Sequence, residues 1–263
     1  MALPLRIRKA GLERVPCLSL QASTGPRSAV RYLLVYTFLT LIISPVGQAQ
    51  APEESTRDIQ FWAYRVGSGN WSEIRFDARP EEVDTLSPGK FMKGRVHEYE
   101  GPASLVFFRE QPDPLPNDPA NIKKIPIAQT VIPNGISKAI LILTAAADDS
   151  GREFNVHFID ANPSSFPSNT IRVFNATGVR LAGKVGTENK YFNPGVSPPF
   201  SLDPFLNKGI PVAFLVETNE GPKFVFEKDL EYAENRRVIL LLEPPRRRGS
   251  YKIQATNLIE RVE

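Results

Sequence analysis

The sequence contains one cysteine and two histidines in 263 residues, and this scarcity excludes several kinds of site. Cys17 lies before a hydrophobic segment that we expect to be removed, so the mature chain has no means of forming a disulfide or a thiolate site. His97 and His157 each fall on a predicted strand, and neither lies in a metal-ligand spacing such as H-E-x-x-H. We expect both histidines to face solvent, and we predict no metal ion and no other cofactor.

Catalytic motifs and helical patterns are also missing. The chain has neither a G-x-S-x-G nucleophile turn nor a G-x-x-x-x-G-K phosphate loop, which excludes two common routes to hydrolysis and nucleotide binding. No segment has the 3.6-residue apolar period of an amphipathic helix, although residues 80–85 and 203–207 could each form a single helical turn. The sequence therefore predicts a protein that is not an enzyme.

Basic charge is confined to the start of the chain. Residues 1–51 hold six of the 32 basic residues and one of the 29 acidic ones, which leaves 26 basic and 28 acidic residues in the body, a net charge of −2. A slightly acidic body offers no basic field for nucleic acid or for an anionic membrane surface. We expect no nucleic-acid partner.

The same first segment has the layout of a secretory signal. Arg31 precedes the apolar run YLLVYTFLTLII, which is followed by Pro45 and by small residues that offer cleavage after Ala49 or Ala51. The run is shorter than the roughly 20 residues that a membrane-spanning helix needs. We predict a signal peptide within residues 1–51, no stable membrane span after cleavage, and export to the periplasm, cell surface or exterior. The region before the apolar run is long, and Val30 is a second candidate start, as a GTG codon would allow.

Two similar hairpins dominate the body. Residues 139–160 combine the apolar run 140–143, a turn with Asp148 and Asp149, and an alternating strand, and residues 238–257 repeat this pattern around the apolar run 239–242. Earlier strands also correspond, since IQFWAY at residues 59–64 matches IRVFNA at residues 171–176. The first strands are offset by 112 residues and the apolar runs by 99, a difference equal to the length of the proline-rich segment 112–124. This spacing favours a duplicated module, although generic β patterning could imitate one.

Each half contains about seven short strands with turn signals every 8 to 12 residues, which is typical of an antiparallel β-sandwich of roughly 100 residues. The predicted fold is all-β, with two tandem antiparallel β-sandwich modules of the immunoglobulin-like type. We place a signal segment at residues 1–51, the first module at 52–162 and the second at 163–263.

The second half carries a resemblance in the stretch IRVFNATGVRLAGKVG followed by NPGVSPPF. Over about 90 residues it resembles β-sandwich domains of unknown function in exported bacterial proteins. In those domains a strand ending in Asn and a small or hydroxyl residue opens the sandwich, and a proline-glycine turn follows. The resemblance implies export and a β-sandwich, and it brings no catalytic residue with it.

Two sets of residues are candidates for partner binding. The aromatic residues Trp62, Tyr64 and Trp71 could form a platform that stacks on sugars or, as we favour, could fill the junction between the modules. Arg246, Arg247 and Arg248 lie at the tip of the second hairpin, where they could grip an acidic partner, a phosphate-rich glycan or the acidic tip of another copy, or could simply be solvated.

Carboxylates supply the alternative hypothesis. Glu98 and Glu100 share one face of a strand, and a glycosidase needs only two facing acids in a cleft. Asp113, Asn117 and Asp118 could bind calcium weakly, but they match no known loop spacing. We expect an exported, non-catalytic envelope protein that binds a protein or glycan or has a structural role. The alternatives are a secreted hydrolase with a carboxylate pair and an accessory subunit of an envelope complex.

Overall fold

The two apolar runs form strands that are buried on both faces. A computed structural model of the chain describes residues 56–112, 122–146, 151–206 and 208–262. In it the run 140–143 lies in β7 (Lys138–Ala145) and the run 239–242 in β16 (Arg236–Glu243). Because both faces of these strands meet apolar side chains, successive positions must be apolar, and this is why the runs are continuous. The predicted signal segment at residues 1–51 lies outside the described residues.

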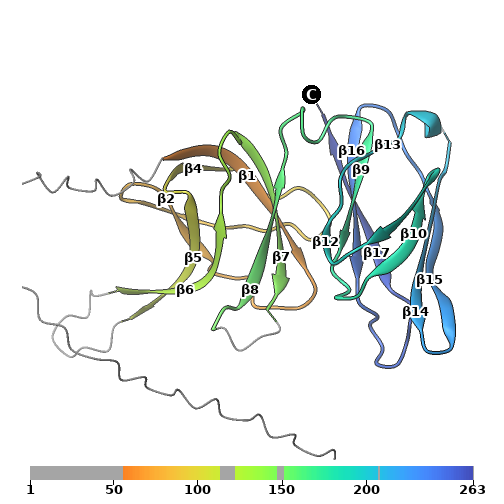
Figure 1. Cartoon of the computed structure of the whole chain (residues 1–263). Helices are drawn as coiled ribbons and strands as arrows, with labels where there is room; N and C mark the ends of the chain where they lie inside the picture. The colour runs from red at the N-terminus through yellow and green to blue at the C-terminus, as the bar shows by residue number, and fades with distance from the viewer. Residues whose placement is uncertain (1–55, 113–121, 147–150, 207, 263) are drawn as a thin grey trace, which may run out of the picture. The chain divides into compact units, whose positions relative to one another are not determined.

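Four sheets contain all the long strands of the described residues, and the prediction of an all-β fold is confirmed. Sheet I has the strand order β4-β1-β7-β8, sheet II β3-β2-β5-β6, sheet III β12-β9-β16-β17 and sheet IV β11-β10-β14-β15. In Figure 1 the strands of sheets I and II run from orange to green and those of sheets III and IV from green to blue, so each pair of sheets comes from one continuous half of the chain.

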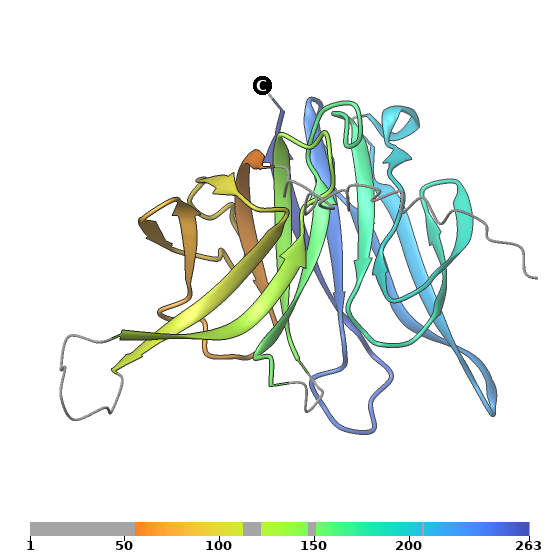
Figure 2. The same ribbon diagram turned by 60° about the vertical axis from the view of Figure 1, so that its left-hand side comes forward.

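The strands of the first half are β1 (Arg57–Val66), β2 (Arg75–Arg79), β3 (Glu82–Thr85), β4 (His97–Gly101), β5 (Ser104–Pro112), β6 (Ile122–Val131), β7 and β8 (Phe154–Asp160). Those of the second half are β9 (Thr170–Asn175), β10 (Leu181–Val185), β11 (Glu188–Phe192), β12 (Gly195–Val196), β13 (Phe200–Ser201), β14 (Ile210–Thr218), β15 (Gly221–Leu230), β16 and β17 (Gln254–Arg261). Figure 2 shows the β5–β6 hairpin as two long yellow-green ribbons.

Strand order corresponds between the halves. Sheets I and III each place their first strand beside the apolar strand and the last strand at the edge, and sheets II and IV each join two hairpins in the same order. In both halves the first strand pairs in parallel with the apolar strand, as β1 with β7 and β9 with β16. The prediction of antiparallel sheets is therefore right for most pairings and wrong for these two. Between the first strand and the apolar strand the chain crosses to the other sheet and returns, and such a crossover brings the two strands together in parallel.

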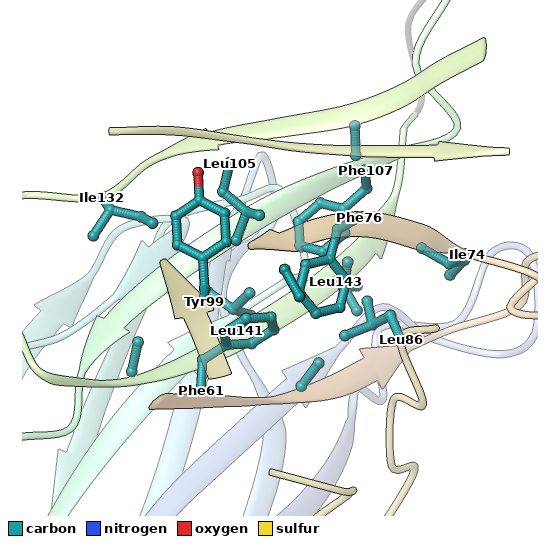
Figure 3. Close-up of a cluster of buried hydrophobic side chains, with 14 of the residues drawn as sticks. Phe61, Ile74, Phe76, Leu86, Tyr99, Leu105, Phe107, Ile132, Leu141 and Leu143 are labelled. Carbon is teal, nitrogen blue, oxygen red and sulfur yellow. The ribbon is translucent and has the colours of Figure 1, made fainter. Parts of the chain in front are cut away.

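Three clusters of buried side chains fill the spaces between the sheets. The first cluster lies between sheets I and II, and Figure 3 shows Phe61 and Leu141 pointing toward Phe76 and Phe107. The second cluster lies between sheets III and IV in the same manner. The middle cluster joins sheet I to sheet III through alternate residues of β1, β7 and β16, together with Ile159 of β8, Phe174 of β9, Leu258 of β17 and Phe166 of the connecting segment. The described residues accordingly belong to one compact unit, Gln50–Glu263.

Two local predictions have different outcomes. Residues 80–85 form β3 and its turn, not a helical turn, because Glu82 and Val83 continue a tight hairpin with β2. Residues 203–205 form a single 3-10 turn, as expected, with Pro204 near its start, where the missing amide hydrogen has no cost.

Candidate functional site

The three candidate aromatic residues do not gather in one place. Trp62 and Tyr64 lie on the face of β1 that meets sheet III, and their exposed fractions are 3 % and 1 %. Trp71 is partly buried at the first cluster, where its ring centre lies 5.6 Å from that of Phe154. The rings of Trp62 and Tyr64 are therefore not accessible to a sugar in this structure.

A buried carboxylate connects these aromatic residues to the second half. Glu260 of β17 accepts hydrogen bonds from the indole N–H of Trp62, from the Tyr64 hydroxyl at 3.0 Å and from Arg237 Nε at 2.9 Å. Burial raises the pKa of the Tyr64 hydroxyl well above its ordinary value, and the charge of Glu260 adds to this effect.

Arg237 completes this buried network. Its Nη1 donates to the carbonyl oxygens of Ala161 at 2.7 Å and Phe166 at 3.3 Å, while Arg237 and Glu260 are only 7 % and 6 % exposed. Both oxygens of Glu260 and two nitrogens of Arg237 are thus engaged within the protein. This pair therefore joins the two halves through hydrogen bonds made within the protein.

The expectation that both histidines face solvent is wrong for His97. His97 is 1 % exposed, its Nδ1 lies 2.8 Å from Asp84 Oδ2, and its ring contacts those of Phe61 and Phe76. Burial lowers the pKa of His97, and the hydrogen bond to Asp84 only partly offsets this effect. For Asp84, burial opposes ionisation, but the hydrogen bonds from His97 and the Thr85 N–H give a lowered carboxyl pKa.

His157 lies elsewhere and is partly buried. Its Nε2 is 3.1 Å from Thr144 Oγ1, and its ring meets the edge of Phe174 at 4.8 Å between centres. Burial lowers its pKa as well. Because the two histidines contact different clusters, they form no shared site.

The carboxylates of the hydrolase hypothesis that the structure describes share one arginine at the surface. Arg79 contacts Glu98 through Nη2 and lies 3.9 Å from Glu100 through Nε, so one guanidinium serves both acids. Asp148, Asp149 and the possible calcium ligands Asp113, Asn117 and Asp118 lie outside the described residues. Among the described residues, no three histidine, cysteine or acidic side chains are close enough to hold a metal ion.

A cleft of about 760 Å³ opens where sheets I and III meet, at the end of β1. Its lining comes from separate segments of both halves: Arg65, Val66, Gly67, Ser68, Lys90, Phe91, Thr144, Ala145, Ala176, Leu241, Glu243, Pro244, Arg246, Gln254, Ala255 and Thr256. This volume lies within the range of roughly 300 to 1,000 Å³ that is usual for ligand sites.

One wall of the cleft is a tight loop formed by residues 89–94. The Gly89 N–H donates to the Ala63 carbonyl oxygen at 2.9 Å, and the Gly89 carbonyl oxygen accepts the Arg65 N–H at 2.8 Å. These two hydrogen bonds fix the loop beside β1. A Cβ atom on Gly89 would lie 2.0 Å from the Met92 carbonyl oxygen, so only glycine permits this close approach. The loop holds Phe91 and Met92 outward, with 57 % and 79 % of their surfaces exposed.

The turn formed by residues 244–250, which carries the arginine triplet, also contributes to the lining through Pro244 and Arg246. Arg246 lines the cleft, whereas Arg247 and Arg248 are exposed and do not line it. At the base of this turn, Glu243 Oε1 accepts the Gly67 N–H at 3.0 Å and links the two halves. Of the predicted site residues, the structure thus brings only Arg246 into the cleft.

The lining of the cleft contains more basic than acidic side chains. Within the described ranges neither Lys90 nor Arg246 forms an ion pair with a carboxylate, and Glu243 is the acid in the lining. Arg65 also lines the cleft. Because side chains alternate along β1, that of Arg65 points away from the face that carries Tyr64. Its Nε is buried without a hydrogen-bond partner in the described part of the chain. Lys90 and Phe91 were not among the predicted site residues, although the pattern Lys-Phe-Met-Lys between two glycines is a visible signal in the sequence.

No protein-family model matches this sequence, and a search of curated proteins found no match either. In the described part of the chain, no helix has the length and apolar character to cross a membrane.

Proposed function

We propose that this chain is an exported, non-catalytic protein of the cell envelope that binds an anionic partner in the cleft between its two halves. One observation carries the proposal: Lys90 from the first half and Arg246 from the second line the same cleft, and neither has a carboxylate partner among the described residues. Cations that the protein itself leaves unpaired are available to neutralise an acidic partner.

The architecture we propose is a tandem pair of immunoglobulin-like sandwich modules, 52–162 and 163–263. The matching strand orders of the two halves support this assignment, as does the shared parallel pairing of the first strand with the apolar strand. The hydrogen bonds of Glu260 and Arg237 would then fix one module against the other, and this arrangement would set the shape of the cleft.

Export rests on the amino-terminal segment and on the resemblance of residues 171–200 to domains of exported bacterial proteins. The periplasm, the cell surface and the exterior are all compatible with it. Within this setting, the partner is a protein or a glycan of the envelope, and an accessory role in an envelope complex is one form of the same binding function. The hydrolase alternative has less support, because the side chains of Glu98 and Glu100 are more than half exposed and do not form the sheltered acid pair that a glycosidase needs.

Site-specific photo-crosslinking in the producing cells tests the proposal. A photoreactive residue replaces Ser68 in the cleft, and a control replaces Asn189, an exposed residue of β11. We expect an adduct of defined mass from position 68 only, in the exported fraction, and a weaker yield when Arg246→Glu is added. Equal adducts from both positions, or none from position 68, would contradict the proposal.

A further inference from the structure

We propose that the ligand of the cleft is an extended acidic peptide segment in which a carboxylate lies next to a large apolar side chain. The inference rests on the proposed function and adds the chemistry of the partner. It follows from the way in which the 89–94 loop combines exposed apolar side chains with cations beside a polar groove.

The apolar part of the proposed site is Phe91 together with Met92. Large apolar side chains that are more than half exposed are common features of protein contacts, and methionine adapts its shape to different partners. The backbone hydrogen bonds of Gly89 and the close approach at Gly94, whose Cβ would lie 2.5 Å from the Ser87 carbonyl oxygen, hold the loop in one shape. Little backbone conformational entropy is therefore lost when a partner covers the tip.

The charged part surrounds this tip. Lys90 places Nζ 4.9 Å from the centre of the Phe91 ring, and Lys93 places Nζ 3.9 Å from that of Trp62. Arg246 lines the same cleft as Lys90 and Phe91. A group that binds here can therefore contact cations and an exposed apolar ring together, which suits a carboxylate followed closely by an apolar side chain.

Between the walls, the lining offers hydrogen-bonding groups suited to a peptide backbone. Ser68, Thr144, Gln254 and Thr256 supply side-chain donors and acceptors along the groove. A peptide main chain needs such partners at regular intervals once it leaves water.

A glycan fits these groups less well. Sugar recognition uses open aromatic faces, but Trp62 and Tyr64 are buried and the Phe91 ring carries Lys90 over it. A uronic-acid oligosaccharide shares the anionic chemistry, so the experiment includes one as a separate probe.

Calorimetric titration of the processed full chain with four probes tests the inference. The probes are the peptide Glu-Asp-Leu-Phe-Glu-Asp, its neutral form Gln-Asn-Leu-Phe-Gln-Asn, the acidic form without apolar residues Glu-Asp-Ser-Gly-Glu-Asp, and an oligogalacturonate. We expect only the first peptide to bind with measurable heat. Arg246→Glu and Phe91→Ser should each weaken its binding by at least about five-fold, since each removes about 1 kcal/mol or more of contact.

Matched controls keep the result specific. Arg247→Glu changes the same charge in the same turn outside the cleft, and Phe224→Ser removes a ring that is 65 % exposed on β15, so both should bind like the parent chain. All four substituted residues are exposed, and unchanged thermal unfolding verifies that the variants fold.

The outcomes separate this inference from the proposed function. Binding of the oligogalacturonate with sensitivity to Arg246→Glu, but not to Phe91→Ser, would overturn the peptide assignment and leave anion binding intact. Absence of binding by every probe at millimolar concentration, or equal binding by parent and variants, would also overturn the peptide assignment. The crosslinking result at position 68 then decides the proposed function independently.

Discussion

The hydroxyl of Tyr64 on β1 donates a hydrogen bond of 3.0 Å to Glu260 on β17, 196 residues further along the chain. This contact crosses from sheet I to sheet III inside the middle cluster, where Arg237 holds the second oxygen of the same carboxylate. A charged network inside an apolar layer contributes little net stability, but it restricts how the two sheets can be aligned. The cleft at the end of β1 depends on that alignment.

Removing the buried carboxylate should destabilise the protein strongly. Glu260→Ala leaves Arg237 charged and buried without its partner, so we expect a loss of about 3 to 5 kcal/mol in the free energy of unfolding, measured by urea denaturation. Glu188→Ala is the control, because Glu188 is exposed and pairs with Lys190 at the surface, and it should cost less than about 1 kcal/mol.

The double variant Arg237→Met with Glu260→Leu supplies the complementary test. Since both charges disappear together, it should cost less than the sum of the two single losses. Additive losses would mean that the two side chains do not act as a pair.

Alkaline stability should depend on Tyr64. Burial and Glu260 raise its pKa in the folded chain, whereas tyrosine in the unfolded chain ionises near pH 10. A group with a raised pKa stabilises the fold fully below the pKa of the unfolded chain, and this contribution is lost as the pH rises above about 10. Above pH 10 the free energy of unfolding should therefore fall less steeply in Tyr64→Phe than in the parent chain. The two slopes should differ by up to about 1.4 kcal/mol per pH unit. Identical slopes for the parent chain and the variant would mean that Tyr64 has the same pKa in the folded and unfolded chains.

Both histidines should titrate below their ordinary range. Burial lowers the pKa of His97 and of His157, so the folded protein disfavours their charged forms. The stability that follows is present above about pH 6.5 and is lost as the pH falls through the folded pKa values. Nuclear magnetic resonance of the ring protons should show both midpoints below 6.5 in the folded chain and near 6.5 in urea. A folded midpoint at or above 6.5 for His97 would contradict the buried placement.

The amino terminus of the exported protein should begin at Gln50 or Pro52, after cleavage at Ala49 or Ala51. Intact mass determination of the protein from the exported fraction checks this. The same sample should not react with a thiol reagent, because Cys17 lies in the removed segment. An exported form that retains Cys17 would disprove the signal assignment.

Strands that are buried on both faces are visible in the sequence, whereas some exposed strands are not. The continuous apolar runs predict β7 and β16, and the apolar and aromatic residues of β1 are buried on both faces. In contrast, four of the five residues of β11 are exposed, and β3 has no buried residue, so neither has a periodic apolar signal. Such strands form because a hairpin partner is present, and that partner is visible only in the fold.

The site was harder to predict because its parts are distant in the chain. The sequence places Arg246 at the tip of a hairpin. Arg246 lines the same cleft as Lys90 and Phe91 only because sheets I and III pack together through the middle cluster. The hydrogen bonds of Trp62 and Tyr64 to Glu260 have the same cause, since Glu260 reaches them from the last strand. No local pattern encodes these contacts.

Hydrogen exchange of the exported protein, with and without the partner obtained by crosslinking, tests the central claim most directly. The account predicts that partner binding slows exchange of the backbone amides at Ser68, Phe91 and Arg246, on both walls of the cleft, while β11 and β15 exchange as before. Protection confined to β11 or β15, with the cleft segments unchanged, would place the binding surface elsewhere and contradict the account.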